Sequence, residues 1–323
     1  MKISKEKIKS ILFITLSNLG DIILTTPVLQ RLRDEFPAAK IDVITGAPGK
    51  EIFERHPSVR EVIVQQKNRN FGERLKQLVG LRRNRYDLVV DLKNSLLPYF
   101  SGAKYRSALS VSSRGGIKHK RDEHLLKLAA LGIDPFYNNS FFMPVSAEER
   151  EYVDSLIGSD WKRVVVLNPG AKSHLKRWDA AKYAQLADKI VSELKCRVLV
   201  TGNEDDVEAV SQVVSHVTTP VKDLCEQTSI GALAELIRRS DLVITNDSAP
   251  LHVASAVNTT TIAIFGPSDE KRYGPLSDKS RVIKPGVPCR PCGKALCKKG
   301  PVEGCISNIT VEEVLDTAKQ VLS

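Results

Sequence analysis

The feature that most constrains the fold is a unit of strand, turn, helix and strand between residues 240 and 265. Residues 242–245 form a short apolar run with β-branched side chains, which predicts a buried parallel strand. Turn-forming residues follow at 246–248, Pro250 suits the first turn of a helix, and a second apolar run at 261–265 closes the unit. Such a unit directs a helix N-terminus to the carboxyl edge of a sheet, where anions bind. Alone it is an ordinary building block, so the rest of the chain decides its role.

Similar alternation extends over the whole chain. The expected strands are at 11–16, 41–45, 59–64, 86–92, 164–167 and 197–201. Helical periodicity between and after them is clearest at 22–36, 71–81, 123–131, 180–194, 229–239 and 311–322. This pattern predicts an α/β protein with doubly wound parallel sheets. A length of 323 residues allows two such domains, and a loosely patterned stretch before the second series places them at 1–150 and 151–323.

The composition predicts a protein without a membrane span. Hydrophobic residues make up 42% of the chain, and no apolar run approaches the ~18 residues that a transmembrane helix needs. The apolar run at 11–16 is too short for the core of a signal peptide, so a cytoplasmic location is expected.

The positive charge is confined to the first half of the chain. Residues 1–150 hold 26 Lys and Arg against 16 Asp and Glu, whereas residues 151–323 hold 22 of each. This imbalance favours an anionic partner, which could be nucleic acid, anionic lipid or a phosphorylated substrate. Few aromatic residues interleave with the basic ones, which argues against single-stranded nucleic acid. A merely solvated surface explains the charge equally well.

Four turns lie at the carboxyl ends of expected strands, at 17–21, 168–177, 202–206 and 246–252. In the first, Asp21 follows Gly20, and a carboxylate held rigidly there could serve as a general base. Asp suits the N-cap of the following helix equally well, so both roles remain open.

The other turns carry further candidates. Lys172 and Lys176 could neutralise a phosphate, or belong to a solvated loop. Glu204 and the two acids after it could bind a metal, although acids in a first helical turn are favoured by the helix dipole anyway. His252 could hydrogen-bond a diphosphate, but an isolated His is more often packed or capped.

Four cysteines cluster near the C-terminus with the spacing C-x2-C-x4-C-x7-C: Cys289, Cys292, Cys297 and Cys305. In a cytoplasmic protein this clustering favours zinc or an iron–sulfur cluster over disulfides. The spacing matches no standard site closely, and reduced thiols are an equal alternative.

Taken in order, these motifs resemble the ADP-heptose:lipopolysaccharide heptosyltransferases, glycosyltransferase family nine. The resemblance rests on the Gly-Asp turn and proline-containing helix at 17–27, the loop at 168–178, the Gly-x-Glu turn at 202–204 and the segment at 246–252, followed by Phe-Gly-Pro at 265–267. Each motif is weak alone, but together they span nearly the entire chain.

The resemblance implies a GT-B fold, with two Rossmann-like domains facing a central cleft. It assigns the acceptor to residues 1–150, the nucleotide-sugar to residues 151–323, and an inverting transfer that requires no cofactor. It implies ADP-heptose as donor and an anionic lipopolysaccharide core as acceptor, with peripheral contact at the inner face of the cytoplasmic membrane and no nucleic acid.

The family's residue roles carry over by position. Asp21 becomes the catalytic base, and Lys176 neutralises the departing diphosphate. Glu204 would contact the ribose. The remaining substrate-binding positions are Gly20, Lys172, Asp247, Ser248, Ala249 and His252. Some relatives have a Thr-Thr pair where this chain has Ala171 and Lys172, and Pro250 removes one amide donor from the last motif.

A related transferase that uses another nucleotide-sugar or acceptor is one alternative, and two other classes of function also compete with this assignment. One is a regulatory module centred on a metal at the four cysteines. The other is a different nucleotide-dependent enzyme, such as an epimerase or a dehydrogenase. The dehydrogenase is disfavoured because no G-x-G-x-x-G follows the strand at 11–16.

Overall fold

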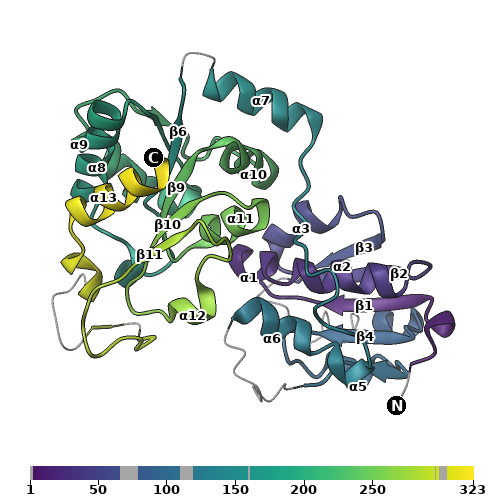
Figure 1. Ribbon diagram of the computed structural model, residues 1–323. Coiled ribbons are helices and arrows are strands. Elements are labelled where there is room, and N and C mark those ends of the chain that lie inside the picture. The colour runs from purple at the N-terminus through teal and green to yellow at the C-terminus, as the bar shows by residue number, and fades with distance from the viewer. Residues whose placement is uncertain (1–2, 66–78, 110–118, 159–160, 295, 298–303) are drawn as a thin grey trace. The chain divides into compact units, whose positions relative to one another are not determined.

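The computed structural model in Figure 1 describes residues 3–65, 79–109, 119–158, 161–294, 296–297 and 304–323. The chain divides into two compact units, Met1–Pro144 and Val145–Ser323. Each unit contains one sheet in which all the paired strands are parallel.

Unit 1 is built on a five-stranded sheet in the order β3-β2-β1-β4-β5. Its strands are β1 (Ser10–Ile14), β2 (Lys40–Thr45), β3 (Val59–Val64), β4 (Leu88–Asp91) and β5 (Tyr105–Arg106). Its helices are η1 (Lys5–Lys7), α1 (Leu19–Ile23), α2 (Thr26–Glu35), α3 (Ala47–Phe53), α5 (Leu97–Phe100), α6 (Lys120–Leu126) and η2 (Ala129–Leu131). β1 and β4 carry almost only buried apolar side chains, as expected for strands covered on both faces.

Unit 2 has a six-stranded sheet in the order β11-β10-β9-β6-β7-β8. Its strands are β6 (Val164–Asn168), β7 (Arg197–Val200), β8 (Lys222–Asp223), β9 (Leu242–Asn246), β10 (Thr261–Ile264) and β11 (Arg281–Ile283). Its longer helices are α7 (Ala147–Ile157), α8 (Ala180–Leu194), α9 (Val207–His216), α10 (Ile230–Arg239), α11 (Ala249–Val257) and α13 (Val311–Leu322). Its short helices are η3 (His174–Lys176), η4 (Glu204–Asp206), α12 (Glu270–Tyr273) and η5 (Gly304–Asn308).

The strand order reverses once in each sheet, beside its first strand. In unit 1 the reversal lies between β1 and β4, and in unit 2 it lies between β6 and β9. Open α/β sheets bind ligands outside the carboxyl ends of the two strands at such a reversal, the topological switch point. Each unit therefore has one switch point, and the predicted doubly wound α/β architecture is confirmed.

The N-terminal helices differ in detail from the predicted ones. The expected helix at 22–36 is two helices, because α1 ends at Ile23 and α2 begins at Thr26 with Pro27 in its first turn. The structure also contains α3, which begins shortly after the expected strand at 41–45 and is not among the expected helices. The helix expected at 71–81 lies largely outside the described residues.

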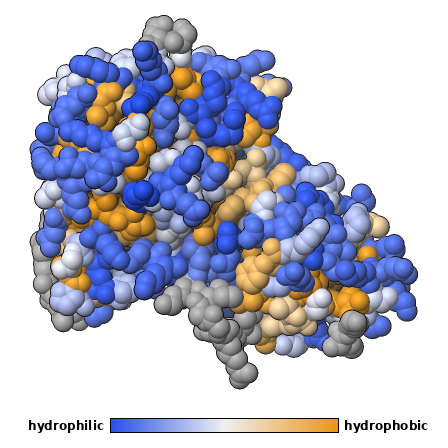
Figure 2. Space-filling model, viewed as in Figure 1, coloured by the Kyte–Doolittle hydropathy of each residue, from blue (hydrophilic) through white to orange (hydrophobic). Residues whose placement is uncertain are grey.

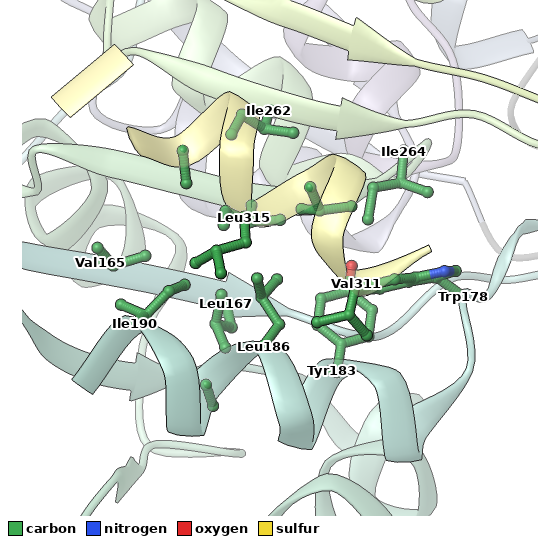
Figure 3. Close-up of a cluster of buried hydrophobic side chains, with 14 of the residues drawn as sticks. Val165, Leu167, Trp178, Tyr183, Leu186, Ile190, Ile262, Ile264, Val311 and Leu315 are labelled. Carbon is green, nitrogen blue, oxygen red and sulfur yellow. The ribbon is translucent and has the colours of Figure 1, made fainter. Parts of the chain in front are cut away.

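A large apolar core holds α8 and α13 on the sheet of unit 2. Figure 3 shows Val311 and Leu315 of α13 directed toward Leu186 and Tyr183 of α8. Thr310 caps α13 by accepting a hydrogen bond from the backbone N–H of Glu313. The final helix is thus part of the core of its own unit.

In the view of Figure 2, hydrophilic residues cover most of the surface, and apolar residues form separate smaller patches. Among the described residues, no helix combines the length and apolar character that crossing a bilayer requires.

Candidate active site

The switch point of unit 2 is occupied by an ion pair between Lys176 and Asp247. Lys176 lies in the loop after β6 and Asp247 directly follows β9, and Nζ is 2.6 Å from Oδ2. The Asp247 side chain is only 5% exposed, so its carboxylate requires a cationic partner. The Lys176 side chain remains 32% exposed, which leaves its ammonium accessible to a ligand.

Buried hydrogen bonds fix the loop that carries Lys176. Asn246, the last residue of β9, accepts a hydrogen bond from the Trp178 backbone N–H (3.2 Å) and donates one to the Pro169 carbonyl (2.7 Å). The indole N–H of Trp178 donates to the Ile309 carbonyl (3.0 Å), and its ring packs edge-on against Tyr183. These contacts tie both ends of the loop to β9, so the position of Lys176 is set by the core.

The N-terminus of α11 lies beside the same ion pair. Ser248 is its N-cap residue, but its side chain makes no capping hydrogen bond and instead lies 3.1 Å from Thr245 Oγ1. Ala249 and Pro250 open the helix, and His252 follows within its first turn at 5% exposure. A helix N-terminus not capped by its own side chain can direct backbone N–H groups and a partial positive charge toward an anion.

Two further predicted residues belong to the same sheet edge. Lys172 is exposed in the loop after β6, and Glu204 is exposed in η4 after β7, the strand that pairs with β6 on its other side. Asp206 has a structural role, since it forms a capping box with Asn203. Burial raises the pKa of Asp206 above its usual value.

The remaining predicted residues lie at the switch point of unit 1. Asp21 occupies the first turn of α1, and Asn18 is the N-cap residue, so the alternative of Asp21 as N-cap is wrong. The Asn18 side-chain amide donates a hydrogen bond of 3.2 Å to Asp21 Oδ2. Gly20 precedes Asp21 in this helix, and the Asp21 side chain is half-buried.

The turn after β4 completes this edge, although the sequence predicts no site residue there. Lys93 is exposed there, and its Nζ donates hydrogen bonds to Gln65 Oε1 (2.6 Å) and Ser17 Oγ (3.4 Å). The bond to Ser17 crosses the switch point. A polar run of Lys, Asn and Ser directly after an apolar strand could have indicated a site here. The residues that follow show no clear periodicity, so the turn was not recognised as one of the strand-end turns.

The four clustered cysteines do not form a recognisable metal site. Cys289 and Cys292 are exposed, Cys297 and Cys305 are half-buried, and none of the four is in a disulfide. No group of three or more His, Cys, Asp or Glu side chains among the described residues could hold a metal ion, and residues 298–303 lie outside them. The predicted zinc or iron–sulfur cluster is therefore not supported.

The cysteine-rich segment instead contacts the loop that carries Lys176. A Cβ on Gly304, within this segment, would lie 2.9 Å from Leu175 Cδ2. Gly266, which follows β10 and lies outside the segment, also approaches Leu175, since a Cβ there would lie 2.5 Å from the Leu175 carbonyl oxygen. Burial raises the pKa of the Cys305 thiol, which favours its neutral form. The segment thus packs against Leu175, the residue before Lys176.

Known proteins resemble this chain in both sequence and fold. The sequence model of glycosyltransferase family 9 (heptosyltransferase) matches residues 74–303. A lipooligosaccharide heptosyltransferase 2 of Campylobacter jejuni is 26% identical over 319 residues, covering 94% of this chain and 95% of that protein. The lipopolysaccharide heptosyltransferase 2 of Escherichia coli K12 is 29% identical over 307 residues, covering 85% of this chain and 87% of the relative.

A solved structure extends the likeness to three dimensions. The Escherichia coli ADP-heptose lps heptosyltransferase II superimposes with a TM-score of 0.76 at 27% identity, over 97% of this chain and 98% of that one. Two parallel sheets, each with a polar switch point, are the architecture of a GT-B glycosyltransferase. The chain belongs to glycosyltransferase family 9, the heptosyltransferase family.

Proposed function

We propose that this glycosyltransferase moves a heptose from ADP-heptose to a hydroxyl group of a lipopolysaccharide core. The donor and acceptor are suggested by the names of its relatives. The observation that carries the proposal is the Lys176–Asp247 ion pair, which lies at the switch point of unit 2 beside the N-terminus of α11. A partly exposed ammonium and a helix N-terminus at one switch point suit a diphosphate.

Asp21 is the proposed general base. Its carboxylate takes the proton of the acceptor hydroxyl as the oxygen attacks the anomeric carbon of the donor sugar. The new carbon–oxygen bond forms on the face opposite the leaving group, so the configuration inverts. Asp21 suits this role because its rigid helical turn places it at a sheet edge, with a neutral amide as its hydrogen-bond partner.

Lys176 stabilises the leaving group in this proposal. The bond between the anomeric carbon and the diphosphate oxygen breaks, and the oxygen departs with the electron pair. The Lys176 ammonium and the N–H groups of Ser248 and Ala249 neutralise the charge that develops. No metal ion is required for this step.

Asp247, His252 and Glu204 orient the donor. Asp247 keeps Lys176 in place through Oδ2, and its second oxygen can accept a hydrogen bond from a sugar hydroxyl. His252 would contact the heptose or the diphosphate, and Glu204 would accept hydrogen bonds from the ribose hydroxyls. Lys172, in the same loop as Lys176, supplies a second positive charge near the phosphates.

The two halves of the chain divide the substrates between them. We assign the donor to residues 151–323 and the acceptor to residues 1–150, which hold 26 basic against 16 acidic residues. A lipopolysaccharide core carries phosphates and carboxylates, so a basic half suits it. The same charge favours peripheral contact with an anionic membrane surface.

A combined binding and transfer experiment tests the proposal. We expect ADP-heptose and ADP to raise the melting temperature of the purified protein, while UDP- and GDP-sugars leave it unchanged. The protein should then transfer heptose from ADP-heptose to a core lacking that heptose, as measured by mass spectrometry. Stabilisation by a non-adenine nucleotide alone would overturn the donor assignment.

A further inference from the structure

We propose that Lys93 binds a carboxylate or phosphate group of the acceptor, at the switch point of unit 1 beside the hydroxyl that reacts. This inference rests on the proposed function, because it takes the acceptor to be the ligand of this sheet edge. It adds a specificity-determining residue that recognises the charge of the acceptor.

The position of Lys93 is the first reason. It follows β4, and its ammonium hydrogen-bonds Ser17, which follows β1, so its side chain spans the point where the strand order reverses. Asn18, the next residue, donates to the Asp21 carboxylate. The cation and the proposed base are therefore linked through adjacent residues of one turn.

The partners of Lys93 are the second reason. Both of its acceptors, Gln65 Oε1 and Ser17 Oγ, are neutral oxygen atoms. Among the ion pairs of the described residues in unit 1, none involves Lys93, and its side chain is exposed. The positive charge is thus held in place without being neutralised, which is the arrangement that an incoming anion requires.

The third reason is that buried groups build the turn that carries Lys93. Asp91, 2% exposed, accepts hydrogen bonds from the backbone N–H groups of Lys93 (2.8 Å) and Ser95 (2.6 Å). Lys127, 5% exposed, donates to the Asp91 carbonyl (2.8 Å) and to the side chain of Asn94. Burial lowers the pKa of Lys127, and the Asp91 carboxylate opposes this shift. Burying two charged side chains costs desolvation free energy. That this cost is accepted to shape an exposed turn indicates that the geometry of the turn is important.

Gly46 brings the opposite side of this site into place. A Cβ at this position would lie 2.6 Å from the Ser17 carbonyl oxygen and 2.7 Å from its Cα. The end of β2 and the turn after β1 can therefore approach this closely only with glycine. The Gly46 N–H also donates to the Leu16 carbonyl (3.1 Å), which fixes the turn that presents Ser17 to Lys93.

The test compares Lys93→Gln with Lys40→Gln as its matched control. Lys40 is exposed at the amino end of β2, on the opposite edge of the same sheet, so both variants remove one positive charge from unit 1. The probe is a delipidated inner-core oligosaccharide that lacks its heptose, prepared intact, with its carboxylates reduced to alcohols, or with its phosphates removed. Calorimetry without donor measures binding, and a transfer assay measures kcat and KM.

We expect Lys93→Gln to weaken binding of the intact oligosaccharide and raise its KM by roughly tenfold or more, the loss expected for a hydrogen bond between charged groups. The KM for ADP-heptose and the melting temperature should not change, Lys93→Arg should recover most of the affinity, and Lys40→Gln should behave as wild type. If Lys93 recognises the carboxylate, the oligosaccharide with reduced carboxylates should bind the wild type and Lys93→Gln equally. If Lys93 recognises the phosphate, the oligosaccharide without phosphates should do so.

The outcomes separate this inference from the proposed function. Wild-type affinity of Lys93→Gln for the intact probe overturns the inference, and so does an equal loss of affinity for probes with and without their anionic groups. Wild-type protein that binds the probe through Lys93 but transfers no heptose overturns the proposed function alone. Wild-type protein that does not bind the probe overturns the inference directly.

Discussion

The two switch points use a lysine and an aspartate in opposite ways. In unit 2, Lys176 and Asp247 form a direct ion pair of 2.6 Å. In unit 1, Lys93 and Asp21 each have neutral partners, Ser17 and Gln65 for the lysine and Asn18 for the aspartate. The same pair of residue types is therefore coupled at one sheet edge and uncoupled at the other.

This difference follows from what each unit must do in the proposed reaction. A lysine that meets a diphosphate must be held in one place, and a buried carboxylate does this while the ammonium remains partly exposed. A base must leave its carboxylate oxygens open to the acceptor hydroxyl, and a direct ion pair with a lysine would occupy them. Separate neutral partners at the edge of unit 1 avoid that conflict.

The largest expected effect is at Asp21. Asp21→Asn keeps the shape of the side chain but removes the base, so kcat for transfer should fall by about 10²- to 10⁴-fold. ADP binding, measured by calorimetry, should be unchanged because we propose that the donor binds to the other unit. Asp122→Asn is the matched control, since Asp122 also occupies the first turn of a helix in unit 1. Normal turnover by Asp21→Asn would show that Asp21 is not the general base.

The next effect concerns the coupled lysine. Lys176→Ala removes a charge-assisted contact to the diphosphate and leaves the Asp247 carboxylate without its partner, so the Kd for ADP should rise by about 10- to 100-fold. Lys189→Ala, on the outer face of α8 in the same unit, should bind ADP as the wild type does. Unchanged ADP affinity in Lys176→Ala would show that the ion pair is only structural.

A smaller effect is expected from the backbone of unit 1. Gly46→Ala places a Cβ 2.6 Å from the backbone carbonyl oxygen of Ser17, an overlap that should cost about 1–3 kcal/mol of unfolding free energy. The KM for the acceptor should rise while the affinity for ADP stays constant, since the substitution disturbs only the switch point of unit 1. Gly80→Ala is the control, because a Cβ there meets no atom within 4 Å. Equal melting temperatures for the two variants would contradict the close approach.

The sequence was sufficient for the longer strands of both sheets, but not for the short edge strands β5, β8 and β11 or for the long-range contacts at each switch point. Apolar β-branched runs such as 242–245 and 164–167 appear as strands because burial on both faces leaves few alternatives. The N-cap residues Asp179 and Thr310 directly precede the helices expected at 180–194 and 311–322, whereas Ser229, expected as the first residue of a helix, is the N-cap of α10. These features are local, so they are visible within a short window of sequence.

The ion pair and the turn after β4 depend on contacts over long distances in the sequence. Lys176 and Asp247 are 71 residues apart, and Lys93 and Ser17 are 76 residues apart. Only the strand order brings each pair together, and no single stretch of sequence encodes that order. This is why Lys176 and Asp247 were predicted as separate ligands and Lys93 was not predicted at all.

The smallest expected effect is that of metal removal. In the proposed reaction the diphosphate is neutralised by Lys176 and the N-terminus of α11, so dialysis against EDTA should change kcat by less than about twofold, whereas losing a metal that stabilises the leaving group would cost several kcal/mol. Wild-type protein treated in parallel with excess Mg²⁺ serves as the reference. A large loss of transfer after chelation, restored by one metal, would mean that the coupled lysine does not suffice. Unit 2 would then need a metal cation in addition to Lys176 to stabilise the leaving group.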